Sequence, residues 1–137
     1  YDVKEIGNNY YMNEFSASIG IIQLKKLDRL NAIRKTIAKR FSSELNLQTK
    51  SKFDKNCSYH LYWILVKNRD KFRKKMFENG IETGTHYKPV HKMSAYKSKN
   101  KLENTEKIGN RIATIPCHPN LSDSQIDKII KMVNKYS

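Results

Sequence analysis

The sequence has 137 residues, with 27 Lys and Arg against 13 Asp and Glu, which gives a net charge of +14. This length allows one ordinary domain with a single core, and eight Tyr, five Phe and one Trp argue against a disordered chain. The longest uncharged apolar run, around Leu61 to Val66, is far shorter than the roughly 20 residues of a membrane span. We therefore expect no membrane association, and no signal peptide, because no charged start followed by an apolar stretch opens the sequence.

The first residue, Tyr1, is not a start methionine, and residues 1–7 read like the interior of a longer sequence. We expect a domain cut from a larger protein. Cys57 and Cys117 are too few for a disulfide scaffold, so we expect a reducing, cytoplasmic setting. Both are expected to be small buried hydrophobic residues. Cys57 and His60 have ligand-like spacing but lack a second spaced pair, so no metal site is expected.

The basic residues are spread over all the expected elements, and Lys outnumbers Arg. Phosphate- and base-binding sites favour Arg, because its planar guanidinium forms paired hydrogen bonds. The pattern favours solvated helix faces over a nucleic-acid surface, although an acidic or phosphorylated small ligand, or an acidic partner domain, remains compatible with it.

Along the chain, residues 1–12 are expected to be irregular, and Asn13 is expected to cap a helix that begins at Glu14. Apolar residues continue at helical spacing for about thirty residues, and their face shifts near Asp28. We predict one bent helix or two consecutive helices with this apolar stripe inward: Phe15, Ile19, Ile22, Leu24, Leu27, Leu30, Ile33, Ile37, Phe41 and Leu45.

Residues 59–66 are aromatic and β-branched, which predicts the central strand of a small sheet. A short amphipathic helix is expected over 70–79, with Gly80 just after it. Its apolar face is predicted to carry Phe72, Met76 and Phe77. A second strand is expected over 81–87, followed by a short helical turn over 91–96.

A further helix is expected over 103–113, with Ile108 and Ile112 inward, and residues 114–119 are expected to be extended. Ser122 and Gln125 have capping-box spacing and open the last helix, whose apolar stripe is Ile126, Ile129, Ile130 and Val133. The predicted class is α/β (α+β): a small, mainly antiparallel sheet with helices packed on it, preceded by the long bent helix.

Two polar segments are candidates for binding. Residues 7–14 form a loop rich in Asn and Tyr at a helix start, where amide and phenol donors join free backbone N–H groups and can bind an anion. Residues 83–91 contain two His, a Tyr, a Lys and two Thr at a strand end, which suits a ligand with phosphate and hydroxyl groups. Purely structural roles are equally compatible with these residues: a turn plus a helix cap for 7–14, and a polar loop for 83–91.

Four ordered motifs carry a family resemblance: Gly7-x-Asn9-Tyr10-x-Met12-Asn13-Glu14, Ser58-Tyr59-His60-Leu61-Tyr62, Thr83-Gly84-x-His86-Tyr87-x-Pro89-x-His91 and Pro116-x-His118-Pro119-x-Leu121-Ser122. From Gly7 to the final helix, the sequence resembles the C-terminal part of the DegT-type (DegT/DnrJ/StrS) nucleotide-sugar aminotransferases. These enzymes use pyridoxal phosphate (PLP) on an aspartate-aminotransferase-like fold.

The resemblance implies roles for seven residues. Asn9 would reach across a homodimer to the cofactor phosphate of the neighbouring subunit. Tyr11 stands where the family usually has an Arg that helps with the anionic side of the site. His86, Tyr87 and His91 would line the nucleotide-sugar pocket, and His118 with Pro119 would shape the last strand-to-helix corner.

The resemblance also implies that residues 1–12 are an interdomain loop and residues 13–137 the small C-terminal domain. The Schiff-base lysine and its neighbours belong to a larger N-terminal domain that this sequence does not contain. The parent enzyme would transfer an amino group from glutamate to a nucleotide-linked keto-sugar, and the chain alone would bind PLP weakly and be inactive. Two alternatives remain: a basic interaction or nucleic-acid-binding regulatory module, and a degenerate aminotransferase-like protein, which Tyr11 in place of Arg leaves open.

Overall fold

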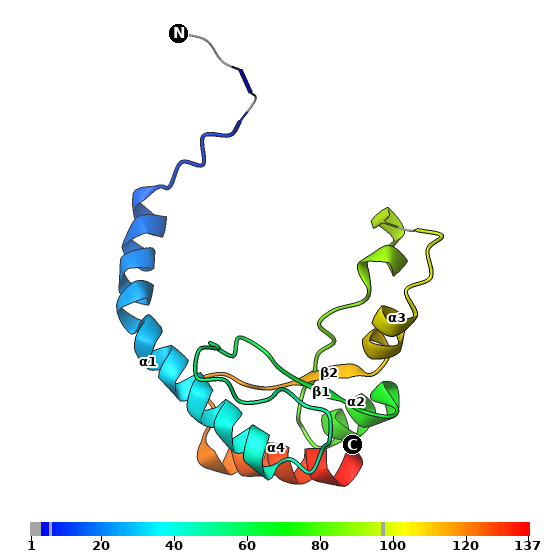
Figure 1. The fold of residues 1–137 in the computed structure, drawn as a ribbon. Coiled ribbons are helices and arrows are strands. Elements are labelled where there is room, and N and C mark those ends of the chain that lie inside the picture. The colour runs from blue at the N-terminus through cyan, green and yellow to red at the C-terminus, as the bar shows by residue number, and fades with distance from the viewer. Residues whose placement is uncertain (1–3, 6, 97) are drawn as a thin grey trace.

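The computed structural model describes residues 4–5, 7–96 and 98–137. Its helices and strands confirm the predicted class of a small antiparallel sheet with helices packed on it, preceded by a long helix (Figure 1). In chain order they are α1 (Glu14–Glu44), β1 (Tyr62–Leu65), α2 (Arg69–Glu78), the short 3₁₀ helices η1 (Val90–Lys92) and η2 (Ser94–Tyr96), α3 (Glu103–Gly109), β2 (Ile112–Ile115) and α4 (Asp123–Tyr136).

The sheet consists of β1 and β2, which pair antiparallel with Tyr62 opposite Ile115 and Leu65 opposite Ile112. The prediction of a strand over 81–87 is wrong. Within it only Gly84 bridges to Thr114, through a pair of backbone hydrogen bonds of 3.0 and 2.9 Å. The chain then leaves the sheet, and His86, two residues after Gly84, bonds to the Thr114 side chain instead of extending the ladder.

The prediction of a helix over 103–113 is also wrong at its C-terminal end. The observed helix, α3, ends at Gly109, and Ile112 begins β2. Gly and Asn at 109 and 110 disfavour a continuing helix, whereas the β-branched residues that follow pair with β1. Ile108 was expected to point inward but is half exposed, and Phe77 at the end of α2 is likewise exposed.

Helix α1 is one continuous helix of 31 residues, capped by the Asn13 side chain, which accepts a hydrogen bond of 2.9 Å from the Ser16 N–H. Its axis curves along its length (Figure 1). Only the C-terminal half contributes to the core, through Ile37, Ala38 and Phe41. The apolar residues of the N-terminal half, which were expected inward, are exposed: Phe15, Ile19, Ile22, Leu24 and Leu27.

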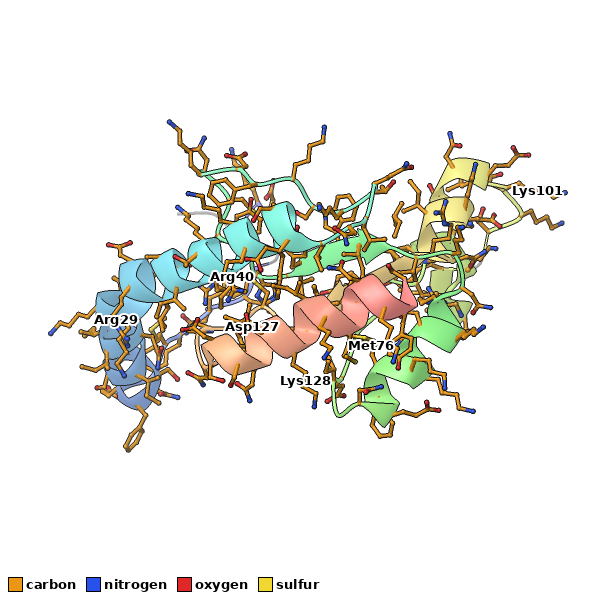
Figure 2. The ribbon with its side chains drawn as sticks, turned by 90° about the horizontal axis from the view of Figure 1, so that it is seen from below. Arg29, Arg40, Met76, Lys101, Asp127 and Lys128 are labelled. Atoms are coloured by element: carbon orange, nitrogen blue, oxygen red, sulfur yellow. The ribbon has the colours of Figure 1, made fainter. Side chains whose placement is uncertain are left out.

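The core lies between the C-terminal half of α1, the sheet, α2 and α4 (Figure 1). Phe41 packs edge-on against Tyr62 with ring centroids 5.1 Å apart, and the Tyr62 hydroxyl donates to the Ser51 carbonyl at 2.8 Å. The predicted stripe of α4 is buried in full, and its capping box is present. Between α1 and α4, Arg40 and Asp127 point toward one another (Figure 2).

Helix α2 ends as the sequence predicts. Gly80 has a φ of 72°, in the left-handed region that glycine adopts without strain. Its N–H donates to the Phe77 carbonyl at 2.8 Å, and the Ile81 N–H donates to the Met76 carbonyl at 2.9 Å. This pair of bonds is the Schellman arrangement, and it turns the chain toward the segment that carries the candidate site.

Candidate functional site

The candidate residues Asn9 and Tyr11 lie on an exposed arm that precedes α1. The arm extends from the far end of α1, away from the sheet (Figure 1). Segment 83–91 lies on the other side of the molecule, beyond the sheet and toward α3. The fold of a single chain therefore does not bring Asn9 and Tyr11 together with His86, Tyr87 and His91.

His86 is fixed from two sides. Its Nδ1 lies 2.7 Å from the Thr114 hydroxyl oxygen of β2, and its ring packs edge-on against that of Tyr87 at 4.9 Å. The ring lies directly over Gly84, where a Cβ atom would come within 2.5 Å of it. Glycine at 84 thus allows the segment to approach β2 closely enough for the His86–Thr114 contact. Tyr87 itself is exposed.

A pocket of about 610 Å³, the histidine pocket, lies beside His86. It brings together three of the motifs recognised in the sequence, because His60, His86 and His118 all line it. Thr83, Thr114 and Arg73 add further polar groups. His60 and Arg73 were not among the predicted site residues, and His118 was assigned only to a corner. The position of His60 and His118 inside ordered motifs is the signal that could have identified them.

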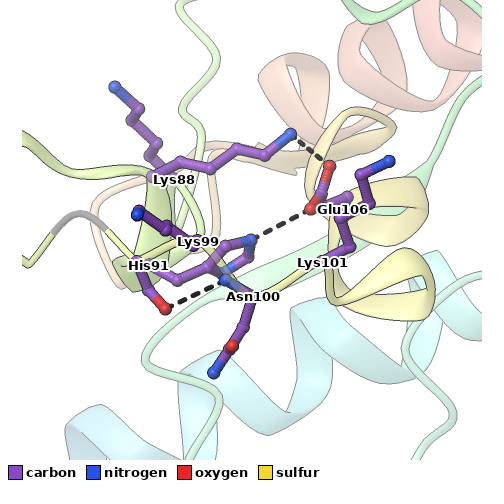
Figure 3. A pocket seen from close by; sticks show the side chains of 8 residues that line it. Lys88, His91, Lys99, Asn100, Lys101 and Glu106 are labelled. Atoms are coloured by element: carbon purple, nitrogen blue, oxygen red, sulfur yellow. Dashed lines mark hydrogen bonds and ion pairs between the residues drawn. The ribbon is translucent and has the colours of Figure 1, made fainter.

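His91 lies in a different pocket, of about 450 Å³, between η1, residues 98–101 and α3 (Figure 3). Its Nε2 is 3.1 Å from the Glu106 carboxylate, which also pairs with Lys92 and accepts from the Leu102 N–H at 3.3 Å. Hydrogen bonds from Lys92 and His91 lower the pKa of Glu106 to about 2. We call this the lysine pocket. Its remaining lining residues are Lys88, Ser98, Lys99, Asn100 and Lys101.

The two cysteines differ. Cys117 is buried, as predicted, and burial raises the pKa of its thiol to about 11, so that it is protonated at neutral pH. Cys57 is exposed, which corrects the prediction that it is buried. The loop around Cys57 lies outside the core because Asp54 and Asn56 form a turn there. Within the described ranges, no group of three or more His, Cys, Asp and Glu side chains could hold a metal ion.

None of the lysines that the structure describes is buried. Lysines that form a covalent bond to PLP need a desolvated site, and no described lysine has one within this chain by itself. The basic side chains lie on different elements and at both ends of the molecule, as Arg29, Lys128 and Lys101 illustrate (Figure 2). No helix among the described residues is both long enough and apolar enough to cross a membrane.

Comparison with known proteins matches residues 1–134 to the DegT/DnrJ/EryC1/StrS aminotransferase family. The chain is 31% identical over 132 residues to dTDP-4-dehydro-2,3,6-trideoxy-D-glucose 4-aminotransferase of Saccharopolyspora spinosa, covering 90% of this chain and 34% of that protein. It is 28% identical to GDP-perosamine synthase of Escherichia coli O157:H7, covering 96% of this chain and 38% of that protein. The chain spans between a third and two fifths of the length of these relatives.

Solved structures agree with the sequence match. A DegT DnrJ EryC1 StrS aminotransferase from Brucella abortus superimposes with a TM-score of 0.87 at 27% identity, covering 99% of this chain and 39% of that one. DesV from S. venezuelae, solved in complex with a ketimine intermediate, gives a TM-score of 0.85 at 27% identity, with the same coverage. The ordered motifs, the fold and the match over residues 1–134 lead to one conclusion: the chain belongs to the DegT/DnrJ/EryC1/StrS aminotransferase family.

Proposed function

We propose that this chain is the C-terminal part of a PLP-dependent transaminase that moves an amino group from glutamate to a keto-sugar attached to a nucleotide. The observation that carries the proposal is the family match over residues 1–134. It is supported by relatives whose names specify aminotransfer to dTDP-linked and UDP-linked sugars. Residues 1–12 act as the interdomain loop and 13–137 as the small domain.

The described residues supply part of a PLP site and not the whole of it. Asn9 is exposed and offers two amide N–H donors, which suit a phosphate. An imine-forming lysine in a desolvated site is missing from the described ranges, so the remainder of the parent enzyme would provide it. PLP, when bound there, supplies the electron sink for amino transfer, and this chain contributes binding and positioning.

The position of the arm supports a site shared between two subunits. Asn9 and Tyr11 are exposed and lie far from His86 within one chain (Figure 1). They can therefore contribute to an active site only beside another domain or another copy of the chain. We assign Asn9 to the cofactor phosphate of the neighbouring subunit in a homodimer, and Tyr11 to the substrate side of that same site.

The exposed apolar half of α1 supports a larger parent protein. Phe15 is 83% exposed and Ile19, one turn further on the same face, is 64% exposed, and Ile22 extends this surface. A soluble monomer seldom exposes an extended apolar patch of this kind, because covering it removes apolar surface from water. The surface is suited to packing against the cofactor-binding part of the parent.

His86, Tyr87 and His91 are assigned to the substrate. His86 and His91 each line a pocket with polar groups, which supports a role for both in binding a polar ligand. His86 lies within hydrogen-bond distance of Thr114 and His91 within that of Glu106, so each ring has one partner that restricts its orientation. Side chains restricted in this way position a substrate with a smaller loss of side-chain entropy on binding.

The first test concerns the chain alone. PLP is added, the mixture is reduced with borohydride, and labelled lysines are identified by mass spectrometry. We expect only scattered, substoichiometric labelling and no transaminase activity. Stoichiometric labelling of one lysine would overturn the assignment of the cofactor lysine to another part of the parent. The gene provides a second test: it should encode a PLP-binding domain upstream of Tyr1, and translation starting near Tyr1 would refute the proposal.

The second test concerns the shared site and uses the parent enzyme. A subunit with Asn9→Ala is mixed with a subunit that lacks the Schiff-base lysine. If Asn9 acts across the dimer, mixed dimers regain one intact site and activity returns. If Asn9 acts within its own subunit, mixing restores nothing and the cross-subunit role is excluded. Asn8→Ala is the matched control, because Asn8 is the adjacent exposed residue with the same side chain.

A further inference from the structure

The N-terminal half of α1 is uncharged and largely apolar around its whole circumference. Residues 15–24 contain no charged side chain, although charged residues make up 29% of the sequence. All of them are exposed except Ala17, which is half-buried. A helix that is apolar on every side is normally enclosed by protein on every side, because no face of it is suited to water. This part of α1 therefore requires cover from more than one direction.

The apolar residues of this segment lie on two sides of the helix. One side is the surface of Phe15, Ile19 and Ile22, which is suited to the cofactor-binding part of the parent. A second stripe, the outer stripe, follows the helical spacing of three and four residues and consists of Ala17, Gly20, Ile21 and Leu24. Residues two positions apart on a helix point about 200° apart, so Ile19 and Ile21 lie on nearly opposite sides. One packed surface therefore cannot cover both.

The buried half of the same helix shows which of these two residues faces outward. Residues eighteen positions apart are about five whole turns apart and share one side of a helix. Ile19 has this relation to Ile37, which is 2% exposed in the core. Ile21 has the same relation to Lys39, which is exposed. Ile19 thus continues the core-facing side of α1, and Ile21 continues the side that faces away from this chain.

Gly20 gives independent support for a close contact on the outer stripe. Glycine inside a helix lowers its stability relative to alanine, and a Cβ atom added at Gly20 would meet nothing within 4 Å in this chain. The packing of this chain therefore gives no reason for glycine at this position. A glycine beside the small Ala17 side chain allows the backbone of a partner to approach the helix closely.

The arm before α1 identifies the partner as a second copy of the parent chain. Asn9 precedes Glu14 by five residues, which span at most about 18 Å when fully extended. Leu24, the last residue of the outer stripe, lies about 15 Å along the helix from Glu14. A neighbouring subunit whose cofactor phosphate is bound by Asn9 therefore lies within reach of the outer stripe.

We propose that the outer stripe of α1 packs against the neighbouring subunit of a homodimer, while Phe15, Ile19 and Ile22 pack against the cofactor-binding part of their own subunit. This inference rests on the proposed function, because it requires a parent enzyme with two subunits. It adds that the helix carrying the arm is held from both sides. The position of Asn9 in the shared site then depends on the dimer contact directly beside it.

The first experiment places a photo-reactive leucine analogue at position 21 of the parent enzyme or, as the matched control, at position 19. The copy with the analogue carries heavy isotopes, and dimers are formed with an excess of unlabelled light copies. After irradiation and digestion, crosslinked peptides are sorted by mass. We expect position 21 to give heavy–light pairs, which arise only between subunits, and position 19 to give heavy–heavy pairs within one subunit.

The second experiment uses Gly20→Ala, whose effects in the chain and in the parent should have opposite signs. In the 137-residue chain the added methyl group favours the helix, so the unfolding midpoint should stay the same or rise. In the parent, the dimer dissociation constant should rise at least about tenfold, because overpacking a close contact is destabilising. Gln23→Ala, between the two apolar sides of the same helix, is the control and should leave the dissociation constant unchanged.

The outer-stripe contact is overturned if position 21 gives no heavy–light pairs, or if Gly20→Ala and Gln23→Ala have equal dimer dissociation constants. A parent with transaminase activity that fails either test overturns this inference alone. A gene without a PLP-binding domain upstream of Tyr1 overturns the proposed function and this inference with it, so the two failures are distinguishable.

Discussion

His86 and Thr114 are 28 residues apart in the sequence, yet the Nδ1 atom of one lies 2.7 Å from the hydroxyl oxygen of the other. This contact ties the loop after Gly84 to strand β2, and Thr114 is buried. It therefore sets the direction in which the His86 ring faces the histidine pocket. Removing the hydroxyl while keeping the shape of the side chain isolates its contribution.

We expect Thr114→Val to lower the free energy of unfolding by about 0.5–1.5 kcal/mol, the usual net worth of one hydrogen bond. The imidazole signals of His86 in the NMR spectrum should shift, since the ring loses its fixed partner. Thr105→Val on the exposed face of α3 is the control, and its effect should stay within about 0.5 kcal/mol. Unchanged His86 signals in Thr114→Val would contradict the contact.

Local signals predict the parts of the fold that depend on neighbouring residues. The capping box of Ser122 and Gln125 predicts the start of α4, and Gly80 predicts the end of α2, because caps satisfy backbone groups within a few residues of themselves. Periodicity predicts that α1 is amphipathic. It does not predict which half of the helix the rest of the chain covers, since that depends on contacts distant in sequence.

The same reasoning explains what the sequence misses in the site. His60, His86 and His118 share one pocket because the segment after β2 and the loops next to β1 meet through strand pairing. Strand pairing joins residues that are about fifty positions apart, and no local pattern encodes it. The threonines over 83–85 favour a strand by type, but only Gly84 finds a partner in the sheet.

Helix α1 offers a direct test of its two halves, because the same substitution can be made in each. Phe41 is fully buried and Phe15 is 83% exposed. Phe41→Ala should lower the free energy of unfolding by about 3–5 kcal/mol, because it leaves a cavity in the core. Phe15→Ala should change it by less than about 0.5 kcal/mol.

Urea unfolding followed by circular dichroism measures both values, and Phe41→Leu is the milder variant if Phe41→Ala does not fold. A large loss from Phe15→Ala would show that the N-terminal half of α1 packs against this chain in solution. That result would contradict the exposed apolar surface on which the larger parent protein is argued.

The lowered pKa of Glu106 predicts that the stability of the folded chain depends on pH. Its pKa is lowered from 4.5 to about 2 in the folded chain by hydrogen bonds from Lys92 and then His91. A carboxyl whose pKa is lower in the folded state stabilises that state above its unfolded pKa. This contribution is therefore fully present above about pH 4.5 and is lost as the pH falls toward about 2.

We expect Glu106→Gln to be less stable than the unchanged chain at pH 6, and the difference to shrink steadily below pH 4.5. Thermal unfolding at a series of pH values measures this convergence. Glu103→Gln, an exposed substitution on the same helix, should run parallel to the unchanged chain over that range. A constant difference between Glu106→Gln and the unchanged chain would refute the ion pairs of Glu106.

The two thiols should differ in reactivity. Cys57 is exposed, whereas Cys117 is buried and its thiol has a pKa raised to about 11 by burial. Thiolates, not thiols, react with disulfide reagents, so Cys117 is protected both by its surroundings and by its protonation at pH 8. A disulfide reagent at pH 8 should therefore modify one thiol quickly, and the second only after denaturant is added. Cys57→Ser should abolish the fast phase, and Cys117→Ser should leave it intact. The reverse pattern would contradict the structure, because it would mean that residues 54–58 shield Cys57 and that the region around Cys117 opens to solvent.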